Sequence, residues 1–205
     1  ETTTGPLGQG LSNAVGMAIA EEIFRKKFGS EVINNKTYVI ASDGDLMEGV
    51  ASESASLAGH LQLANLCWIY DDNKITIEGE TDLAFSEDVG RRFEGFGWRV
   101  EYVDDANDAS SLSRALQAFK HETEKPTLIV VKSVIGFGAP TKAGSHSSHG
   151  APLGPDEIAG AKEAYDWPTQ ETFHVPNGVV EHFQGSISAR GQHANASWQT
   201  AHQKL

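Results

Sequence analysis

The sequence predicts an α/β fold in which a parallel sheet carries helices on both faces. Short runs rich in Val, Ile and aromatic residues alternate along the chain with longer segments whose apolar residues recur at helical spacing. The runs at residues 66–70 and 127–131 are almost entirely apolar, which is typical of strands buried on both faces of a parallel sheet. The 205 residues are enough for one such domain with its own core.

Glycine and apolar spacing define the elements of the first part of the chain. Residues 5–10 are dense in glycine and proline, which predicts an irregular loop. The helix that follows ends at Gly29 and is expected to bury the stripe of Leu11, Val15, Ala18, Ile19 and Ile23. Residues 38–41 predict a strand that enters a turn at Asp43 and Gly44. On the next helix, which contains Gly59, we expect one stripe to pack closely against the sheet: Val50, Ser54, Leu57 and Leu61.

Three elements are predicted between the strand at residues 66–70 and the strand at residues 127–131. A helix is expected over residues 86–94 and a strand over residues 98–103. Asp108 then caps a helix whose apolar stripe is Leu112, Ala115, Leu116 and Phe119.

The last third of the chain is less regular. Residues 136–154 are rich in Gly, Ser and His without periodicity, which predicts a functional loop. A helix begins at Pro155, because proline suits the first helical position. After Trp167 the composition becomes polar, and a linker with a terminal helix over residues 194–203 is expected.

Charge and cysteine content exclude several classes of function. The net charge is -12, and 16 of the 28 acidic residues lie between Asp43 and Asp108, so nucleic acid and anionic membranes are poor partners. No apolar run is long enough to span a membrane. The single Cys67, in an apolar run, excludes an intrachain disulfide and fits a reducing compartment. No secretion signal is visible at Glu1, and a cytoplasmic location is expected.

Asp43 and Asn73 are candidate ligands of a divalent cation. Each follows a predicted strand, and in an open parallel sheet the carboxyl ends of neighbouring strands meet at one crevice. A carboxylate, an amide oxygen and nearby backbone carbonyls are hard ligands that suit Mg²⁺ bound together with substrate phosphates. The alternative is that both are ordinary turn residues.

Histidine and glutamate offer less specific signals. His146 and His149 lie in a Gly- and Ser-rich loop, where a zinc site, a phosphate contact or a proton carrier are all compatible with the spacing. Glu48 and Glu53 point about 140° apart on a helix, so they do not share a ligand and are interpreted as exposed helix charge.

Four ordered motifs resemble the transketolase family. They are Gly-Pro-Leu-Gly-Gln-Gly at residues 5–10, Asp43-Gly44 with Asn73 thirty residues later, Gly-Phe-Gly at residues 136–138, and Ser-His-Ser-Ser-His-Gly-Ala-Pro-Leu at residues 145–153. One position departs from the family's Gly-Asp-Gly, since Ser42 stands where glycine is usual. Serine there is strained if the turn needs a positive φ and harmless otherwise.

The resemblance implies thiamine diphosphate and Mg²⁺ (or Ca²⁺) as cofactors. It assigns the metal to Asp43, Asn73 and the carbonyl of Ile75, and a diphosphate contact to the N–H of Gly44. Gly5 and Leu7 are implied to line the aminopyrimidine end of the cofactor, and His149 to face the diphosphate and the substrate. Glu48 and Glu53 match acidic residues that couple the two active sites at a subunit interface. The resemblance therefore replaces their interpretation as exposed helix charge and implies that they are catalytic residues, like His149.

The resemblance also implies the domain organisation and the reaction. Residues 1–167 form a diphosphate- and Mg²⁺-binding domain with the thiamine diphosphate-binding fold, truncated at its N-terminus, and residues 168–205 lead to an absent pyrimidine-binding domain. The expected reaction transfers a two-carbon ketol unit from a ketose phosphate to an aldose phosphate, as in the pentose phosphate pathway. The full-length protein is expected to be a homodimer or to pair with a pyrimidine-domain chain, and the isolated chain to be inactive. A dihydroxyacetone synthase-like transferase and a non-catalytic cofactor-binding half remain alternatives.

Overall fold

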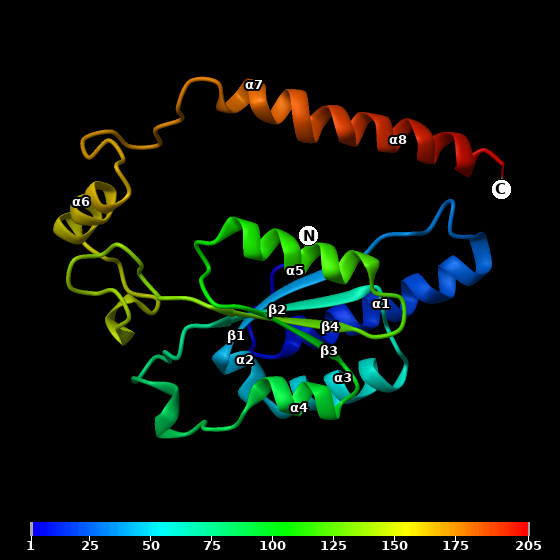
Figure 1. The fold of residues 1–205 in the computed structure, drawn as a ribbon, viewed down its shortest axis with the longest axis horizontal. Coiled ribbons are helices and arrows are strands. Elements are labelled where there is room, and N and C mark those ends of the chain that lie inside the picture. Colours follow the sequence, from blue (N-terminus) through cyan, green and yellow to red (C-terminus); the bar gives the residue numbers. More distant parts are fainter. Residues whose placement is uncertain (1, 205) are drawn as a thin grey trace.

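Four parallel strands form one sheet in the computed structural model, which describes residues 2–204 (Figure 1). The strands are β1 (Thr37–Ser42), β2 (Leu66–Asp72), β3 (Arg99–Val103) and β4 (Thr127–Lys132), and their order in the sheet is β1-β2-β4-β3. Every pairing is parallel, as the apolar runs predict. In Figure 1 the strands end toward the left, where β1 leads into α2 (Asp43–Met47) and where the loop after β4 begins.

Helices cover both faces of the sheet, so the predicted fold class is confirmed. Figure 1 shows α3 (Gly49–His60) and α4 (Val89–Gly95) below the sheet and α5 (Ala109–His121) above it. The first two share a core with α1 (Gln9–Phe28) and with Trp68 of β2. On the other face, α5 packs against Cys67, Val103, Ile129 and Val131 through Ala115 and Phe119. Asp108 caps α5 as expected, because its carboxylate accepts from the backbone N–H groups of Ser110 and Ser111.

The prediction that α3 packs through its stripe of Val50, Ser54, Leu57 and Leu61 is wrong. The helix packs instead through a face of alanines (Ala51, Ala55 and Ala58), while Val50, Leu57 and Leu61 are each more than 40% exposed. Small side chains allow close approach, and a Cβ on Gly59 would lie 1.8 Å from the carbonyl oxygen of Phe96. At Gly59 the close backbone contact is therefore made with the end of α4.

The stripe predicted for α1 is wrong in one member, because Ile23 is 58% exposed. Two boundaries near the strand ends also differ from the expectation. The loop at residues 5–10 is shorter, since α1 already begins at Gln9. Asp43 and Gly44 do not form a simple turn, because they begin the short helix α2. Both differences bring a helix start to the crevice where β1 ends.

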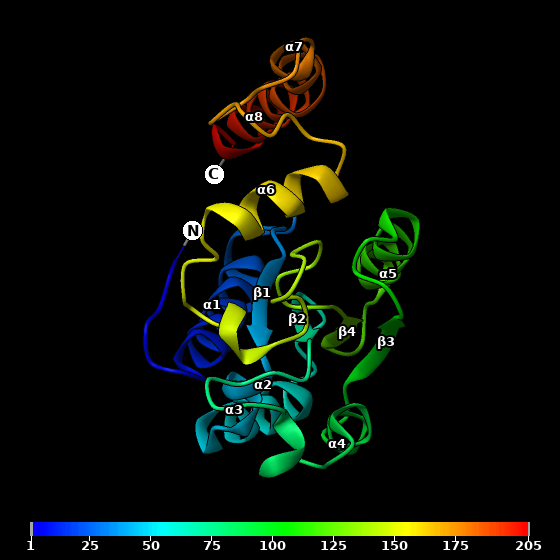
Figure 2. The same cartoon turned by 90° about the vertical axis from the view of Figure 1, so that its left-hand side faces the viewer.

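The loop between β2 and α4 contains η1 (Thr81–Leu83). The C-terminal part runs outside the sheet. It contains η2 (His146–Ser148) in a long loop, α6 (Pro155–Ala164), and one continuous helical run composed of α7 (Val179–Phe183), η3 (Gln184–Ser188) and α8 (Ala189–His202). This run begins earlier than the predicted terminal helix and stands apart from the sheet in Figure 2. Trp198 anchors it, because its Nε1 donates to the carbonyl oxygen of Val32 at 2.9 Å. Across the described residues, every helix is too short or too polar to cross a membrane.

Candidate functional site

The carboxyl ends of β1 and β2 lie side by side at the edge of the sheet that faces the viewer in Figure 2. Ser42 is paired with Asp71 in the strand register, so Asp43 and the residues after Asp71 leave the sheet at the same level. The hydroxyl of Tyr70 connects them, since it lies 2.5 Å from Oδ1 of Asp43 and 3.0 Å from Oδ1 of Asp72.

Asp43 has one carboxylate oxygen without a partner. The side chain is 1% exposed, and its Oδ2 makes no hydrogen bond. Burial raises the pKa of Asp43 above its ordinary value, and Asp72 adds to this, while Tyr70 and Lys74 act in the opposite direction. A buried carboxylate oxygen without a donor is costly, so it marks a place where a cation or another donor fits.

The turn after β2 is held by its own side chains. Oδ1 of Asn73 accepts from the backbone N–H of Ile75 at 2.9 Å, and its Nδ2 donates to Oδ2 of Asp71 at 2.9 Å. Lys74 has a φ of 64° and forms an ion pair with Asp72 at 2.6 Å. The turn therefore presents the amide oxygen of Asn73, which has a second lone pair, and the carbonyl of the buried Ile75 in a defined conformation.

The oxygen atoms of Asp43 and of this turn are suitable ligands for a small hard cation. Asp43 supplies a carboxylate with a free buried oxygen, and the turn at residues 73–75 supplies an amide and a carbonyl oxygen, a set that suits Mg²⁺ or Ca²⁺ when phosphate oxygens and water complete it. In residues 2–204 no group of three or more His, Cys, Asp and Glu side chains is placed to hold a metal. The zinc alternative for His146 and His149 therefore has no third ligand of these types in the described part of the chain.

Ser42 is compatible with the turn although it replaces a common glycine. Its φ is -124°, in the extended region that any residue adopts, so serine introduces no backbone strain here. Its backbone N–H donates to Oδ2 of Asp45 at 3.1 Å.

The loop at residues 5–10 lies against α2 and borders a cavity. A Cβ on Gly44 would lie 3.2 Å from Cδ1 of Leu7, so this side chain packs on the start of α2. A cavity of about 660 Å³ runs along the free edge of β1, and Gly5, Leu7 and Asp45 are among its lining residues. Asp43, Asn73 and Ile75 do not line it, so the cavity and the cation site are separate places that share one loop.

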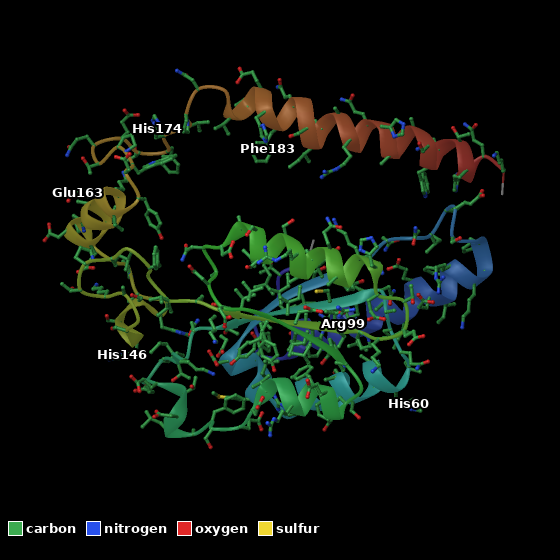
Figure 3. All side chains as sticks on the ribbon, viewed as in Figure 1. His60, Arg99, His146, Glu163, His174 and Phe183 are labelled. Carbon is green, nitrogen blue, oxygen red and sulfur yellow. The ribbon has the colours of Figure 1, made fainter. Side chains whose placement is uncertain are left out.

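The three remaining predicted residues lie on the surface. His149 is exposed at the end of η2, and the labelled His146 in Figure 3 marks this loop beyond the strand ends. Glu48, between α2 and α3, and Glu53, on α3, are exposed too. Asp43, Gly44, Leu7 and the turn at residues 73–75 thus come together, whereas the roles of His149, Glu48 and Glu53 stay predictions.

Sequence reasoning missed Tyr70 and Asp45. Tyr70 belongs to the apolar run of β2 and was therefore assigned to the core, yet its hydroxyl reaches Asp43, which is 27 residues away in the chain. Asp45 gives no local signal of its contact with Gly8, which is 37 residues away in the chain. A polar tip at the end of a buried strand is the one local signal for Tyr70, because a buried phenol needs a hydrogen-bond partner.

Comparisons with known proteins identify the family of this chain. The family described as transketolase, thiamine diphosphate binding domain, matches residues 1–205. The chain belongs to the transketolase family. It is 49% identical over 201 residues to the transketolase of Geobacillus stearothermophilus. The matched region covers 97% of this chain and 30% of that protein.

Solved transketolases share the fold. The transketolase of Leishmania mexicana has a TM-score of 0.94 and 40% identity, with 99% of this chain and 31% of that chain covered. A transketolase of Pichia stipitis solved in complex with sedoheptulose 7-phosphate has a TM-score of 0.91 and 41% identity, with the same coverage. The chain thus spans about 30% of the length of the transketolases that it matches, and corresponds to their thiamine diphosphate-binding portion.

Proposed function

We propose that this chain is the diphosphate- and metal-binding part of an enzyme that transfers a two-carbon ketol unit from a ketose phosphate to an aldose phosphate. The observation that carries the proposal is the free, buried Oδ2 of Asp43 beside the turn at residues 73–75. Family membership over residues 1–205 supports the same reaction class. The pentose phosphate pathway is the expected setting, and the lone buried Cys67 supports a cytoplasmic location.

In this proposal Mg²⁺, or Ca²⁺, is held by Asp43, Asn73 and the carbonyl of Ile75. Bound thiamine diphosphate supplies the carbanion and electron sink that ketol transfer needs. The chain's own part is to hold the diphosphate through the N–H of Gly44 at the start of α2, and to line the aminopyrimidine end with Gly5 and Leu7. The buried surroundings of Asp43 strengthen its attraction for a cation.

The acidic character of this edge makes the cation a requirement. Asp43, Asp71 and Asp72 lie at neighbouring strand ends, and among the described side chains Lys74 is ion-paired with Asp72. A diphosphate that approaches these carboxylates is repelled unless a divalent cation lies between them. We therefore expect cofactor binding to depend strictly on the metal.

We assign His149 to orienting the substrate oxygen or carrying its proton. Its exposure on a loop at the strand ends leaves the ring accessible to a ligand in the crevice. Sugar phosphates are the proposed substrates, in keeping with the sedoheptulose 7-phosphate complex of the Pichia stipitis transketolase.

We further propose that the complete protein is a homodimer or pairs with a pyrimidine-domain chain. The exposed stripe of Val50, Leu57 and Leu61 on α3 is the supporting observation, because apolar side chains gathered on one helix face favour a partner. Glu48, at the junction of α2 and α3, and Glu53, on α3, would reach such an interface, where they would couple two sites.

The test is ketol transfer from xylulose 5-phosphate to ribose 5-phosphate by the complete gene product with thiamine diphosphate and Mg²⁺. Transfer supports the proposal, and its absence under these conditions rejects it. Formaldehyde as acceptor in a parallel assay detects dihydroxyacetone synthase-like specificity. Calorimetric titration of the isolated chain with thiamine diphosphate and Mg²⁺, followed by an activity assay of that chain, tests the binding-half alternative. Turnover by the isolated chain would overturn it.

A further inference from the structure

Asp45 connects two segments that are distant in sequence. Its Oδ1 accepts from the backbone N–H of Gly8 at 2.9 Å, across 37 residues, and its Oδ2 accepts from the backbone N–H of Ser42 at 3.1 Å. One carboxylate thus uses both of its oxygens to join the loop at residues 5–10 to the end of β1. Hydrogen bonds from N–H groups to a carboxylate are stronger than those between neutral groups.

The packing around this link leaves little freedom to the loop. Gly8 has a φ of 76°, and a Cβ there would lie 2.9 Å from Cγ1 of Val50 and 3.0 Å from Cβ of Glu48. Leu7 in turn packs on Gly44. The loop is therefore held by Asp45 on one side and by close contacts with α2 and α3 on the other.

Asp45 also lies at the beginning of two helices. Gly8 directly precedes α1, which has no acidic residue in its first turn and no side-chain cap of its own, and Ser42 directly precedes α2. The N-terminus of a 20-residue helix carries a partial positive charge that a nearby carboxylate stabilises. Asp45 supplies this charge from a different part of the chain.

We infer that Asp45 is a positioning residue that fixes the loop at residues 5–10 relative to the Ser42–Asp43 end of β1. The inference rests on the proposed function, in which that loop lines the aminopyrimidine end of the cofactor and Asp43 holds the metal at the diphosphate end. Asp45 then sets the separation of the two ends of the binding site without being a ligand itself. Its loss uncouples the aminopyrimidine wall from the diphosphate turn.

The test compares Asp45→Ala, Asp45→Asn and Glu94→Ala in the complete gene product. Glu94 is an exposed acidic residue on α4 and serves as the matched control. Two affinities are measured by calorimetry in the presence of Mg²⁺, one for thiamine diphosphate and one for pyrophosphate, which occupies only the diphosphate end. Hydrogen exchange of the amides at residues 5–10 and the thermal unfolding midpoint are measured on the same samples.

For Asp45→Ala we expect thiamine diphosphate to bind about tenfold more weakly, because the loss of a charged hydrogen bond has an effect of about this size. The affinity for pyrophosphate should fall by about threefold or less, because pyrophosphate occupies only the diphosphate end of the site. Amides at residues 5–10 should exchange faster while the unfolding midpoint changes little. Asp45→Asn should lie between Asp45→Ala and the wild type, since it keeps one acceptor oxygen. Glu94→Ala should behave like the wild type.

Two results would overturn the inference. One is unchanged affinity and exchange in Asp45→Ala. The other is an equal loss for both ligands together with faster exchange over the whole sheet, which is the behaviour of a purely structural residue. If the wild type binds no thiamine diphosphate, the proposed function fails, and exchange at residues 5–10, which needs no cofactor, still decides whether Asp45 fixes the loop.

Discussion

The hydroxyl of Tyr70 lies between two carboxylates, 2.5 Å from Oδ1 of Asp43 and 3.0 Å from Oδ1 of Asp72. A phenol has one proton, so at any moment it donates to one of the two. Burial, together with the two nearby carboxylates, raises the pKa of Tyr70, which therefore remains a donor at every physiological pH. Tyr70 occupies Oδ1 of Asp43 and leaves Oδ2 for a cation.

Tyr70→Phe should destabilise the metal-free protein by about 1–3 kcal/mol, because it removes the donor to a buried carboxylate. Urea unfolding measures the change in the free energy of unfolding. Tyr102→Phe is the control, since that side chain is 56% exposed on β3. Equal effects of the two substitutions would show that the hydroxyl of Tyr70 contributes nothing specific.

Asn73→Ala should weaken Mg²⁺-dependent binding of thiamine diphosphate by at least about tenfold, since even an indirect partner of a metal site has effects of that size. Asn107→Ala is a matched control, because the Asn107 amide donates to Asp105 two residues earlier, as the Asn73 amide donates to Asp71. Calorimetry with and without Mg²⁺ measures the affinity. An unchanged affinity in Asn73→Ala would reject the metal-site assignment.

Gly59→Ala should destabilise the protein by about 1–3 kcal/mol, because the new Cβ collides with the backbone of Phe96. Gly16→Ala, in the middle of α1, has nothing within 4 Å of its Cβ and should be neutral or stabilising by up to about 1 kcal/mol. Urea unfolding of both variants gives the comparison. If both substitutions stabilise, the close contact of α3 with the end of α4 is not formed.

Glu21→Gln should stabilise the protein at pH 8, and the gain should shrink as the pH falls. Glu21 is 5% exposed, and burial raises its pKa, while Asn65 partly opposes the shift. With a folded-state pKa above the unfolded value, wild-type stability is fully present below the unfolded pKa and is lost as the pH rises through the folded one. Denaturant unfolding at several pH values checks this. A gain that does not vary with pH would contradict it.

Cys67 should be inert toward iodoacetamide in the folded protein. The thiol is buried in β2, and burial raises its pKa to about 12, so at pH 8 the thiolate fraction is about one in ten thousand. Mass spectrometry after labelling should find no adduct in the native protein and a full adduct in urea. Rapid labelling without denaturant would show that the strand opens locally.

The fold class and the strand ends that bear Asp43 and Asn73 could be predicted from the order of the residues alone. Strand runs, glycine boundaries and the Asp108 cap are local signals, and parallel strands bring their carboxyl ends to one edge whatever the details of packing. The motifs that resemble transketolases are local signals too, and the family match over residues 1–205 confirmed that resemblance.

Which side chains meet depends on how the helices pack on the sheet. The alanine face of α3 is buried instead of its Val and Leu stripe, because the space between α1, the sheet and α4 admits a close helix and excludes large side chains. Tyr70 reaches Asp43 and Asp45 reaches Gly8 across 27 and 37 residues. Such contacts depend on register and helix placement, which are non-local, so no pattern of neighbouring residues contains them.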